Sequence, residues 1–422
     1  MSSASGSAGV SEWRSGYRPL LGAIIGAGCG LSSISFYTHG AFVPAIADDT
    51  GWSRGELQLS VTIMILMAVV TAPAVGFLID RFGPRKIALT SIVLYGAALA
   101  SLSLAGDHIL GYYIGWAVMS IVAAGTLPIT WTRVVTAWFD RRRGIALGIT
   151  LAGTGVAATL APGFVIWLSA AFGWRTAYVI LAATVTAISL PGVYLLFREP
   201  VATKTSEHAT LPTMTPGLTL QAAMRQRRFW FMAIGLLLVA AGISGLITSL
   251  VPMLIDKGFE PAAAGRFAGL IGISVIGGRL ITGFLLDRMW APLVAAVFLS
   301  APAFSAAILL QEQVSQTYLM LAVVIVGLAA GAELDLFAYL ASKYFGLRHY
   351  GAIYGSLYVA FSIGAGIAPF AFGMVYDFNA NYSIALSAVV AMSLVGGLMM
   401  LLLGRYPTDP TPASSDGDVI LR

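Results

Sequence analysis

Charged residues are scarce in this chain of 422 residues: Asp, Glu, Lys and Arg together make up 10% of it, whereas hydrophobic residues make up 58%. A soluble multidomain enzyme needs more charge on its surface, so that class of protein is excluded. Lipid cannot satisfy backbone N–H and C=O groups, and each long apolar run is therefore expected to be a helix. The composition predicts an all-α integral membrane protein.

The chain also has a single cysteine and lacks a nucleotide-binding motif. The single Cys29 excludes an intrachain disulfide and a cysteine-based metal site, and we expect it to be a buried, inert thiol. The chain contains no Gly-x-x-x-x-Gly-Lys-Ser/Thr segment, so a phosphate-binding loop of an ATPase is excluded. We predict no enzymatic activity, no cofactor and no metal, and the lack of a basic and aromatic patch argues against nucleic-acid binding.

About twelve apolar runs are long enough to cross a bilayer, which takes roughly 20 residues in a helix. They lie near residues 18–47, 55–79, 86–106, 109–138, 144–171, 174–197, 229–255, 262–286, 291–311, 316–345, 351–376 and 382–404. The first run is too long for a signal-peptide core and lacks a cleavage pattern, so we interpret it as an uncleaved helix. The predicted divisions are a tail (1–17), a six-helix bundle (18–198), a polar linker (199–228), a second six-helix bundle (229–405) and a second tail (406–422).

The distribution of Lys and Arg predicts the orientation, because these residues strongly disfavour translocation when they lie in short loops. With the N-terminus in the cytoplasm, only Arg54, Arg175, Lys257 and Arg266 remain outside. The net charge of +5 then reflects topology. From the short loops and termini we infer a bacterial inner membrane, with both termini cytoplasmic.

The two halves of the chain repeat one another at an offset of about 207 residues, visible in the segments Gly76–Arg81 and Gly283–Arg288. Further matching landmarks are Gly144 and Gly148 with Gly351 and Gly355, and Ala161-Pro162 with Ala368-Pro369. Two parallel repeats of several apolar spans each are the plan of a secondary transporter with its substrate site between the halves. We expect two pseudo-symmetric six-helix bundles.

The most specific motif is Gly76-x-x-x-Asp80-Arg81-x-Gly83-x-Arg85-Lys86, at the turn between the second and third spans. Here Gly76 permits close helix packing, Asp80 can bind a neighbouring helix end, and Gly83 permits a tight turn. With this motif the sequence resembles the major facilitator superfamily over essentially the whole chain. The resemblance implies two bundles that rock about a central cavity, with Asp80 and Arg81 stabilising the outward-open state. The residues assigned to gating are Gly76, Asp80, Arg81, Gly83, Arg85, Arg133, Asp287 and Arg288.

A narrower resemblance is to the monocarboxylate and oxalate-formate transporters. It lies in Gly51-Trp52-Ser53-Arg54, in Trp138-Phe139 with Arg142-Arg143-Gly144, and in Tyr344-Phe345-Gly346. It implies that Arg279 in the eighth span recognises the substrate's carboxylate. The chain departs from these relatives at Val275, where eukaryotic members carry an acid, and it lacks the eleventh-span lysine of oxalate carriers.

Five ionisable residues lie within the predicted spans, where such residues usually face a partner or a wet cavity. Arg279 stays charged at any working pH and can hold a carboxylate with two hydrogen bonds, which favours a substrate with one carboxylate. The alternative for Arg279 is a structural ion pair with Glu333 or Asp335. Arg133 lies near the inner interface, and its side chain has three possible roles: snorkelling to that interface, pairing with the loop motif, or contact with the substrate.

Proton coupling is assigned to three candidates. Glu333 and Asp335 are two positions apart, about 200° around a helix, so one can face the cavity while the other bonds to neighbouring helices. Desolvated carboxylates can load and release a proton, although charge pairing that ties the tenth span to the eighth or eleventh is an equally good role for these two. His39 occupies a position where monocarboxylate relatives carry lysine, and it is either a proton switch or a satisfied hydrogen-bonding residue.

The sequence thus predicts a monomeric, lipid-embedded secondary carrier of a small organic anion, expected to be a monocarboxylate, coupled to protons. Two alternatives stay open: a proton-driven exporter of drugs or metabolites, and a transporter-like sensor. Besides the charged groups, side chains expected to line the substrate site are Tyr37, His39, Trp131, Tyr339, Tyr358 and Phe361.

Overall fold

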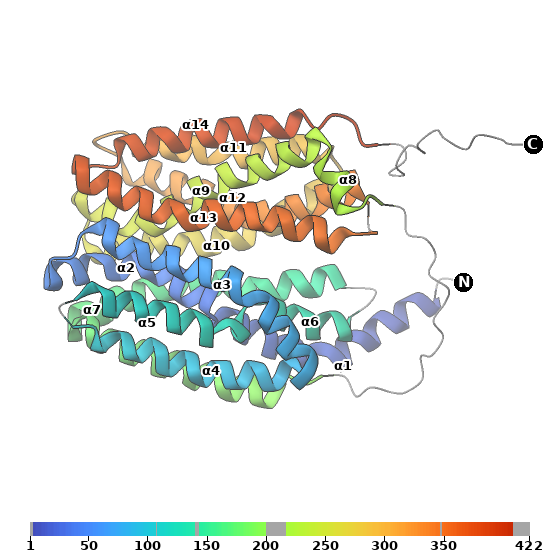
Figure 1. The fold of residues 1–422 in the computed structure, drawn as a ribbon, viewed down its shortest axis with the longest axis horizontal. Coiled ribbons are helices and arrows are strands. Elements are labelled where there is room, and N and C mark those ends of the chain that lie inside the picture. Colours follow the sequence, from blue (N-terminus) through green and yellow to red (C-terminus); the bar gives the residue numbers. More distant parts are fainter. Residues whose placement is uncertain (1–2, 107, 140–142, 200–216, 347, 408–422) are drawn as a thin grey trace, which may run out of the picture.

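The computed structural model describes residues 3–106, 108–139, 143–199, 217–346 and 348–407. Within these ranges the chain is helical, and its only strand-like pairing is an isolated bridge between Gly217 and Gly346. Figure 1 shows two layers of helices, the first from the N-terminal half and the second from the C-terminal half. The predicted all-α fold is confirmed. The predicted linker (199–228) and final tail (406–422) fall largely outside the described residues.

Among the described residues, the first bundle contains seven α-helices and two short 3-10 helices. Its α-helices are α1 (Ser3–Gly28), α2 (Leu31–Thr50), α3 (Arg54–Phe82), α4 (Pro84–Ser101), α5 (Ile109–Val122), α6 (Pro128–Trp138) and α7 (Arg143–Leu196), and its 3-10 helices are η1 (Leu102–Leu104) and η2 (Ala124–Thr126). Helix α1 begins at Ser3, so helical structure extends into the predicted tail (1–17).

The second bundle follows the short helix α8 (Leu220–Met224). Its helices are α9 (Arg227–Asp256), α10 (Pro261–Leu286), α11 (Ala291–Leu309), α12 (Gln316–Phe345), α13 (Tyr350–Asn379) and α14 (Ser383–Leu401). The helices within each bundle pack against one another. The two bundles are joined where α3 packs against α13 and where α7 packs against α10.

Ten segments of the described chain are long and apolar enough to cross a membrane. One of them, α7, crosses twice: its 54 residues span more than twice a ~30 Å hydrocarbon core at ~1.5 Å per residue, and Gly173 reverses it with φ 78°. The shorter α5 and α6 together supply one further crossing. The described helices therefore account for the twelve predicted spans.

Two predicted spans are interrupted, and the interruptions lie side by side. The run at 18–47 breaks at Cys29 and Gly30, and the run at 109–138 breaks at η2. The hydroxyl of Thr126 accepts a hydrogen bond of 3.1 Å from the Leu31 N–H, so a side chain at one break satisfies backbone at the other. Cys29, which was expected to be buried, lies at this break and is partly buried against the core.

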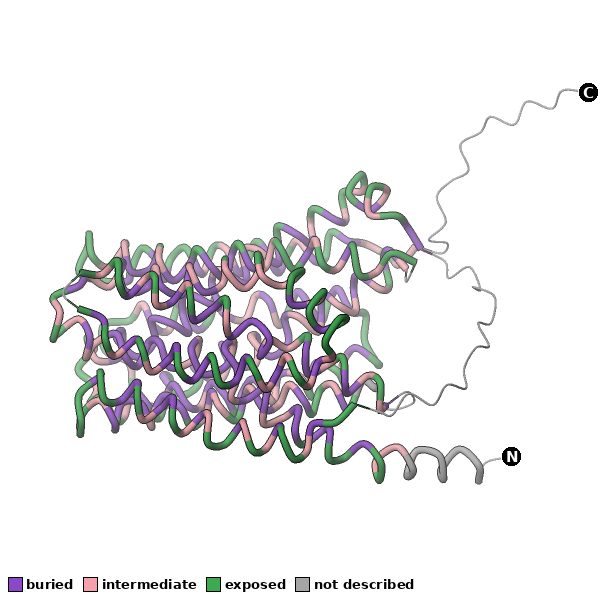
Figure 2. Tube along the Cα trace, turned by 60° about the horizontal axis from the view of Figure 1, so that its bottom comes forward, coloured by how far each residue is buried: buried purple, intermediate pink, exposed green. Residues whose placement is uncertain are grey.

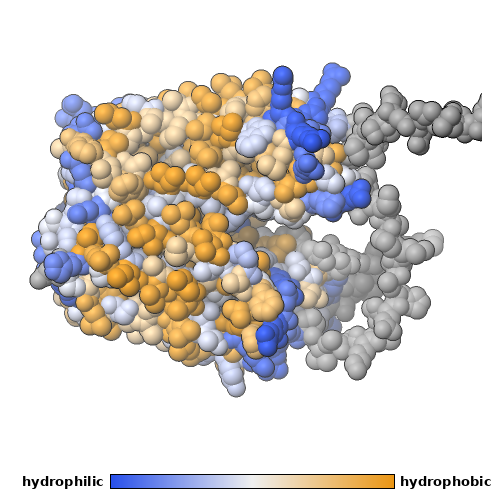
Figure 3. Space-filling model, viewed as in Figure 1, coloured by the Kyte–Doolittle hydropathy of each residue, from blue (hydrophilic) through white to orange (hydrophobic). Residues whose placement is uncertain are grey.

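The surface matches a membrane-embedded protein. Figure 3 shows hydrophobic side chains over the sides of both bundles and hydrophilic ones gathered at the two ends. Figure 2 shows buried residues where helices face one another and exposed residues around the outside. Exposed apolar side chains such as Leu104 and Phe304 need lipid contact to be stable.

The two bundles are packed together at one end only. We name the linker end, where α7 finishes and α8 begins, and the far end, where α3 begins. At the far half, glycines allow close contact: a Cβ added at Gly269 would overlap the backbone oxygen of Thr159, and one at Gly40 would overlap that of Thr248.

Towards the linker end the same helices separate. A Cβ added at Gly76, Gly148, Gly283 or Gly355 would meet no atom within 4 Å. Figure 3 shows the surface hollowed between the bundles on this side. The structure is therefore closed at the far end and open towards the linker end.

Candidate substrate site

Glycines on α10 and α12 bring two charged residues together in the second bundle. A Cβ at Gly278 would overlap the backbone oxygen of Leu328, and one at Gly331 would overlap that of Val275. The two backbones are thus in direct contact, which only glycine allows at these positions. Arg279 directly follows Gly278, and Glu333 lies two residues after Gly331, so both residues lie within one helical turn of this contact.

Arg279, Glu333 and Asp335 form an electrostatic cluster. Arg279 interacts through its charge with both carboxylates. Glu333 is 5% exposed, whereas Arg279 and Asp335 are only partly buried. The two acids therefore differ in exposure, yet both interact with the same guanidinium. The angle of ~200° between them around the helix had instead suggested that they would have different partners.

The cluster contains polar atoms without partners. Arg279 Nε and Glu333 Oε2 are buried and form no hydrogen bond in the described part of the chain. The ion pairs found there join other residues, Arg54 to Asp256, Arg133 to Asp80, and Arg175 to Asp49. Buried polar groups are normally hydrogen-bonded, so these atoms mark a place where a ligand or water completes the site.

Aromatic residues from both bundles surround the cluster. Tyr37, on α2 of the first bundle, interacts electrostatically with Arg279 and with Glu333. On α13, Tyr358 is 42% exposed, stacks on Phe361 at 5.3 Å and interacts with Glu333. Tyr354, which no sequence signal singled out, interacts with Glu333 and Asp335. The structure thus brings together predicted residues from α2, α10, α12 and α13.

One predicted residue, Trp131, lies away from this cluster. Trp131 is 0% exposed and packs edge-on against Phe197 inside the first bundle. Its Nε1 donates a hydrogen bond of 2.9 Å to the backbone oxygen of Thr126. Its large apolar ring fills that bundle's core, so the structure does not bring it to the cluster. Tyr339, another predicted residue, lies one turn after Asp335 on the same face of α12, and the Nζ of Lys343 is 5.4 Å from its ring centroid.

His39 also lies within the first bundle. It is 1% exposed, and its ring meets Trp116 of α5 edge-on at 5.2 Å. The backbone of Leu57 lies beside the ring, so the satisfied histidine and the proton switch both remain open roles for His39. Its neighbour Gly40 packs against the second bundle at Thr248.

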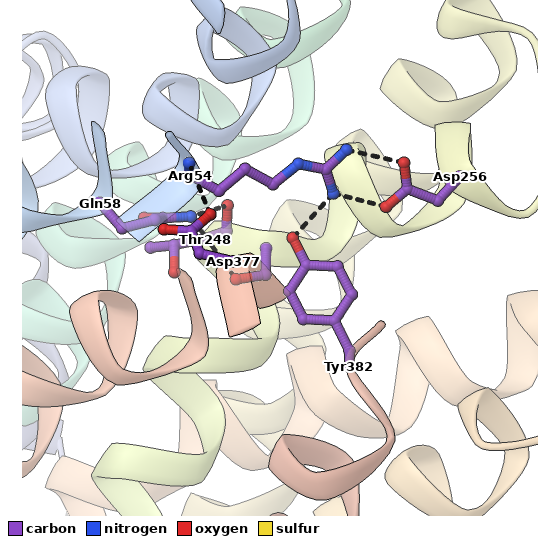
Figure 4. Close-up of polar contacts among 7 residues, drawn as sticks. Arg54, Gln58, Thr248, Asp256, Asp377 and Tyr382 are labelled. Atoms are coloured by element: carbon purple, nitrogen blue, oxygen red, sulfur yellow. Dashed lines mark hydrogen bonds and ion pairs between the residues drawn. The ribbon is translucent and has the colours of Figure 1, made fainter. Parts of the chain in front are cut away.

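The far end is closed by a network centred on Arg54 (Figure 4). The Arg54 guanidinium donates to the two Asp256 oxygens at 2.5 and 2.7 Å and to the Tyr382 hydroxyl at 3.0 Å. It also lies 3.8 Å from the centroid of the Tyr376 ring. One arginine of the first bundle thereby holds three side chains of the second.

Backbone groups add to this closure. Asp377 accepts hydrogen bonds from the backbone N–H groups of Arg54 and Gly55 at 3.0 and 2.8 Å, capping the start of α3. Deeper in the interface, Gln58 Nε2 donates to the Thr248 oxygen at 3.1 Å. Sequence analysis assigned no role to this network. The available signals were the rarity of Lys and Arg on this side and a glutamine within a span.

The loop motif at the linker end makes contacts within the first bundle. Asp80 forms an ion pair with Arg133. Of the three roles that the sequence left open for Arg133, this contact corresponds to pairing with the loop motif. The Arg85 side chain donates to the backbone oxygen of Tyr194 at 2.6 Å, and its backbone N–H donates to the Glu199 carboxylate at 3.2 Å. Gly83 has φ 85°, the left-handed conformation that a tight turn requires.

The remaining gating candidates have local surroundings. Arg81 lies over Phe82, with its guanidinium carbon 5.4 Å from the ring centroid, and Arg288 lies over Phe284 at 3.6 Å. Gly76 has open space beside it, and Asp287 ends α10 as its C-cap. Within the described chain, these contacts of Arg81 and Arg288 do not cross between the bundles.

These features define a class: a two-bundle membrane transporter with a charged, aromatic site between its halves. The chain belongs to the major facilitator superfamily, whose family model matches residues 25–369. The protein is a transporter and not an enzyme.

Similar proteins support this class at low identity. The chain is 29% identical to human monocarboxylate transporter 11 over 60% of this chain and 51% of that one. It is 26% identical to a probable nitrate/nitrite transporter, NarK2, of Mycobacterium tuberculosis over 89% of this chain and 95% of that one. A crystal structure of a bacterial homologue of the human lysosomal transporter Spinster shares the fold, with a TM-score of 0.67, 18% identity, and coverage of 93% and 95%.

Proposed function

We propose that this protein is a secondary active transporter of a small organic anion, a monocarboxylate, which moves by alternating access and is coupled to protons. The observation that carries the proposal is Arg279, a fixed cation with an unpartnered Nε beside the bundle interface. A guanidinium holds a carboxylate with two parallel hydrogen bonds. Tyr37 of the other bundle lies within electrostatic reach of Arg279, so a bound anion would contact both halves.

Proton coupling is assigned to Glu333 and Asp335, with His39 as the further candidate. A carboxylate beside Arg279 can release its hold on the guanidinium when protonated, and the substrate then takes its place. His39 would act less directly, through the packing of Gly40 against Thr248. We place the linker end and both termini in the cytoplasm of a bacterial cell, because Lys and Arg are concentrated there.

The test is uptake of a panel of carboxylates into proteoliposomes under an imposed proton gradient. We expect gradient-dependent uptake by the wild type and its loss in Arg279→Gln. Arg266→Gln is the matched control, since Arg266 is an exposed arginine near the far end of the same helix. If the folded wild type takes up no carboxylate, or if Arg279→Gln transports normally, the proposal fails.

A second candidate is a proton-driven exporter of lipophilic cations. It is favoured by the two carboxylates that outnumber Arg279 and by the exposed ring of Tyr358. This function would protect growing cells against cationic drugs in a way that depends on Glu333 and not on Arg279.

A further inference from the structure

We infer that the linker end of the second bundle carries a binding site for an anionic phospholipid. The site is a cluster of four arginines, Arg225, Arg227, Arg228 and Arg405, which we name the arginine patch. The patch receives the phosphate of the headgroup, and exposed apolar residues deeper in the membrane contact the acyl chains. This surface is separate from the substrate site and takes a different ligand, so the inference does not depend on the proposed function.

The fold brings the arginine patch together from two distant segments. Arg225 follows α8, Arg227 and Arg228 begin α9, and Arg405 follows the end of α14. The Arg228 guanidinium donates to the backbone oxygen of Arg405 at 3.3 Å and lies 5.2 Å from the centroid of the Tyr344 ring. Figure 3, in the view of Figure 1, shows hydrophilic side chains gathered where α8 lies beside the end of α14. The four positive charges therefore share one region of the surface.

No negative charge of the surrounding segments balances the patch. The sequence has no Asp or Glu at 217–255 or at 383–407. Arg228 is partly buried and the other three arginines are exposed, and none of the four forms an ion pair within the described chain. The start of α9 adds the positive end of its helix dipole, since Gln226 provides no side-chain cap and the first turn holds no acid. An anion from outside the chain would stabilise this cluster.

The first bundle shows what a partnered arrangement looks like at the same end. Arg133 pairs with Asp80, and the Arg85 N–H in the first turn of α4 donates to the Glu199 carboxylate at 3.2 Å. There the chain supplies its own carboxylate to a basic helix start, whereas no acid contacts the start of α9 in the described part of the chain. The general preference of Lys and Arg for one side of a membrane places arginines at the linker end, but it does not explain why only this group lacks acidic partners.

One side of α9 follows the chemistry of a lipid molecule with depth. Arg227, Trp230 and Ile234 are all exposed, and their spacing of three and then four residues places them on one side of the helix. At ~1.5 Å per residue, Trp230 lies about 4–5 Å and Ile234 about 10 Å deeper than Arg227, and the headgroup layer is roughly 5–7 Å thick. Arg227 therefore lies at the level of phosphates and Ile234 at the level of acyl chains.

The tryptophan between them is held in place. Trp230 Nε1 donates to the backbone oxygen of Met224 at 2.9 Å, and the ring is 49% exposed. Tryptophan is favoured at the boundary between headgroups and hydrocarbon, where its ring and its N–H face different surroundings. Trp230 thus marks the level of the membrane surface beside the arginine patch.

The apolar surroundings favour a lipid over a soluble anion. On α14, Leu398 and Leu402 are 57% and 62% exposed, and Arg405 follows them towards the linker end. A soluble anion would satisfy the arginines alone, whereas an anionic phospholipid brings a phosphate for the arginines and acyl chains for these apolar side chains. A guanidinium holds a phosphate with two parallel hydrogen bonds, and arginine clusters at this level of a membrane bind anionic headgroups.

The experiment identifies the lipid that lies against Trp230. Purified full-length transporter is reconstituted into phosphatidylcholine vesicles that contain increasing amounts of brominated phosphatidylglycerol or brominated phosphatidylcholine, both of which quench tryptophan fluorescence on contact. The part of the quenching that Trp230→Phe removes reports the patch. We expect phosphatidylglycerol to bind there about tenfold more tightly than phosphatidylcholine, with a preference that weakens as salt is added.

Variants locate the charge. Arg225→Gln, Arg227→Gln and Arg405→Gln, combined in one chain, should bring the two lipids within about twofold of each other. The matched control combines Arg14→Gln and Arg18→Gln, which removes two exposed arginines at the linker end of the first bundle and should keep the preference. Thermal unfolding checks that each variant is folded. Should the triple variant not fold, Arg405→Gln alone should lower the preference about threefold.

Three results would overturn the inference. Equal quenching of Trp230 by the two lipids would show that the arginine patch does not select a charged headgroup. A preference that survives the triple variant, or that the control variant also loses, would place the selection elsewhere on the surface. Loss of the preference on adding inorganic phosphate at constant ionic strength would show that the patch takes a soluble anion and not a lipid.

Discussion

Arg54 of α3 and Asp256 of α9 are joined by two hydrogen bonds of 2.5 and 2.7 Å, although they belong to different bundles. The pair lies at the far end, which is closed, while the glycines at the linker end have open space beside them. A bidentate, charge-assisted contact of this kind favours the conformation in which it forms.

Arg54→Gln should therefore shift the protein towards a conformation open at the far end. Losing these bonds is expected to cost the closed state about 1.5–3 kcal/mol, or a shift of roughly 10- to 100-fold in the equilibrium. The shift is measured by double electron–electron resonance between spin labels at Asp48 and Glu260, in a Cys29→Ser background. Arg175→Gln is the control, because its pair with Asp49 lies within one bundle. An unchanged distance distribution in Arg54→Gln would show that the pair does not hold the far end.

Gly278→Ala should lower stability because its added Cβ would overlap the Leu328 oxygen and force α10 away from α12. We expect a loss of about 1–3 kcal/mol, seen as a lower midpoint of thermal unfolding in detergent. Gly277→Ala is the matched control, since its nearest contact would be an ordinary 3.5 Å to a Leu328 methyl group. Equal midpoints for the two variants would contradict the close backbone contact that places Arg279 beside Glu333.

Trp131 and Tyr37 should respond in opposite ways. Trp131→Phe removes a buried ring and its hydrogen bond, so it should lower the free energy of unfolding by about 1–3 kcal/mol and leave KM for the transported substrate within about twofold. Tyr37→Phe removes a hydroxyl beside Arg279 and should raise KM about tenfold with little change in stability. Unfolding midpoints and uptake kinetics measure both, and a raised KM in Trp131→Phe alone would reverse the assignment.

The Asp80–Arg133 pair should contribute little to the stability of this state. Both side chains are half-exposed, and exposed ion pairs are worth roughly 0–1 kcal/mol. A double-mutant cycle of Asp80→Asn and Arg133→Gln on thermal unfolding should give a coupling within that range. If Asp80 acts in gating, Asp80→Asn should nevertheless slow uptake at least tenfold. Normal uptake by this variant would restrict Asp80 to a local structural role.

Much of the fold followed from patterns that are local in the sequence. Lipid requires each apolar run to be helical, so run length and hydropathy predicted twelve spans, and the repeat of Gly76–Arg81 at Gly283–Arg288 predicted two bundles. The breaks at Gly30 and η2 were missed, because they are stabilised by a hydrogen bond between residues 95 positions apart.

Part of the candidate site could likewise be predicted from the sequence, and part of it could not. Arg279, Glu333 and Asp335 were predicted as site residues from their charge. A charged residue within a span is costly in lipid unless it has a partner or faces a wet cavity. Sequence alone could not separate Tyr37, which reaches Arg279, from Trp131, which fills a core, because both are aromatic residues in apolar runs. Nor could it join Arg54 to Asp256, Tyr382 and Asp377. Those contacts depend on how two bundles meet, and only the tertiary structure decides that.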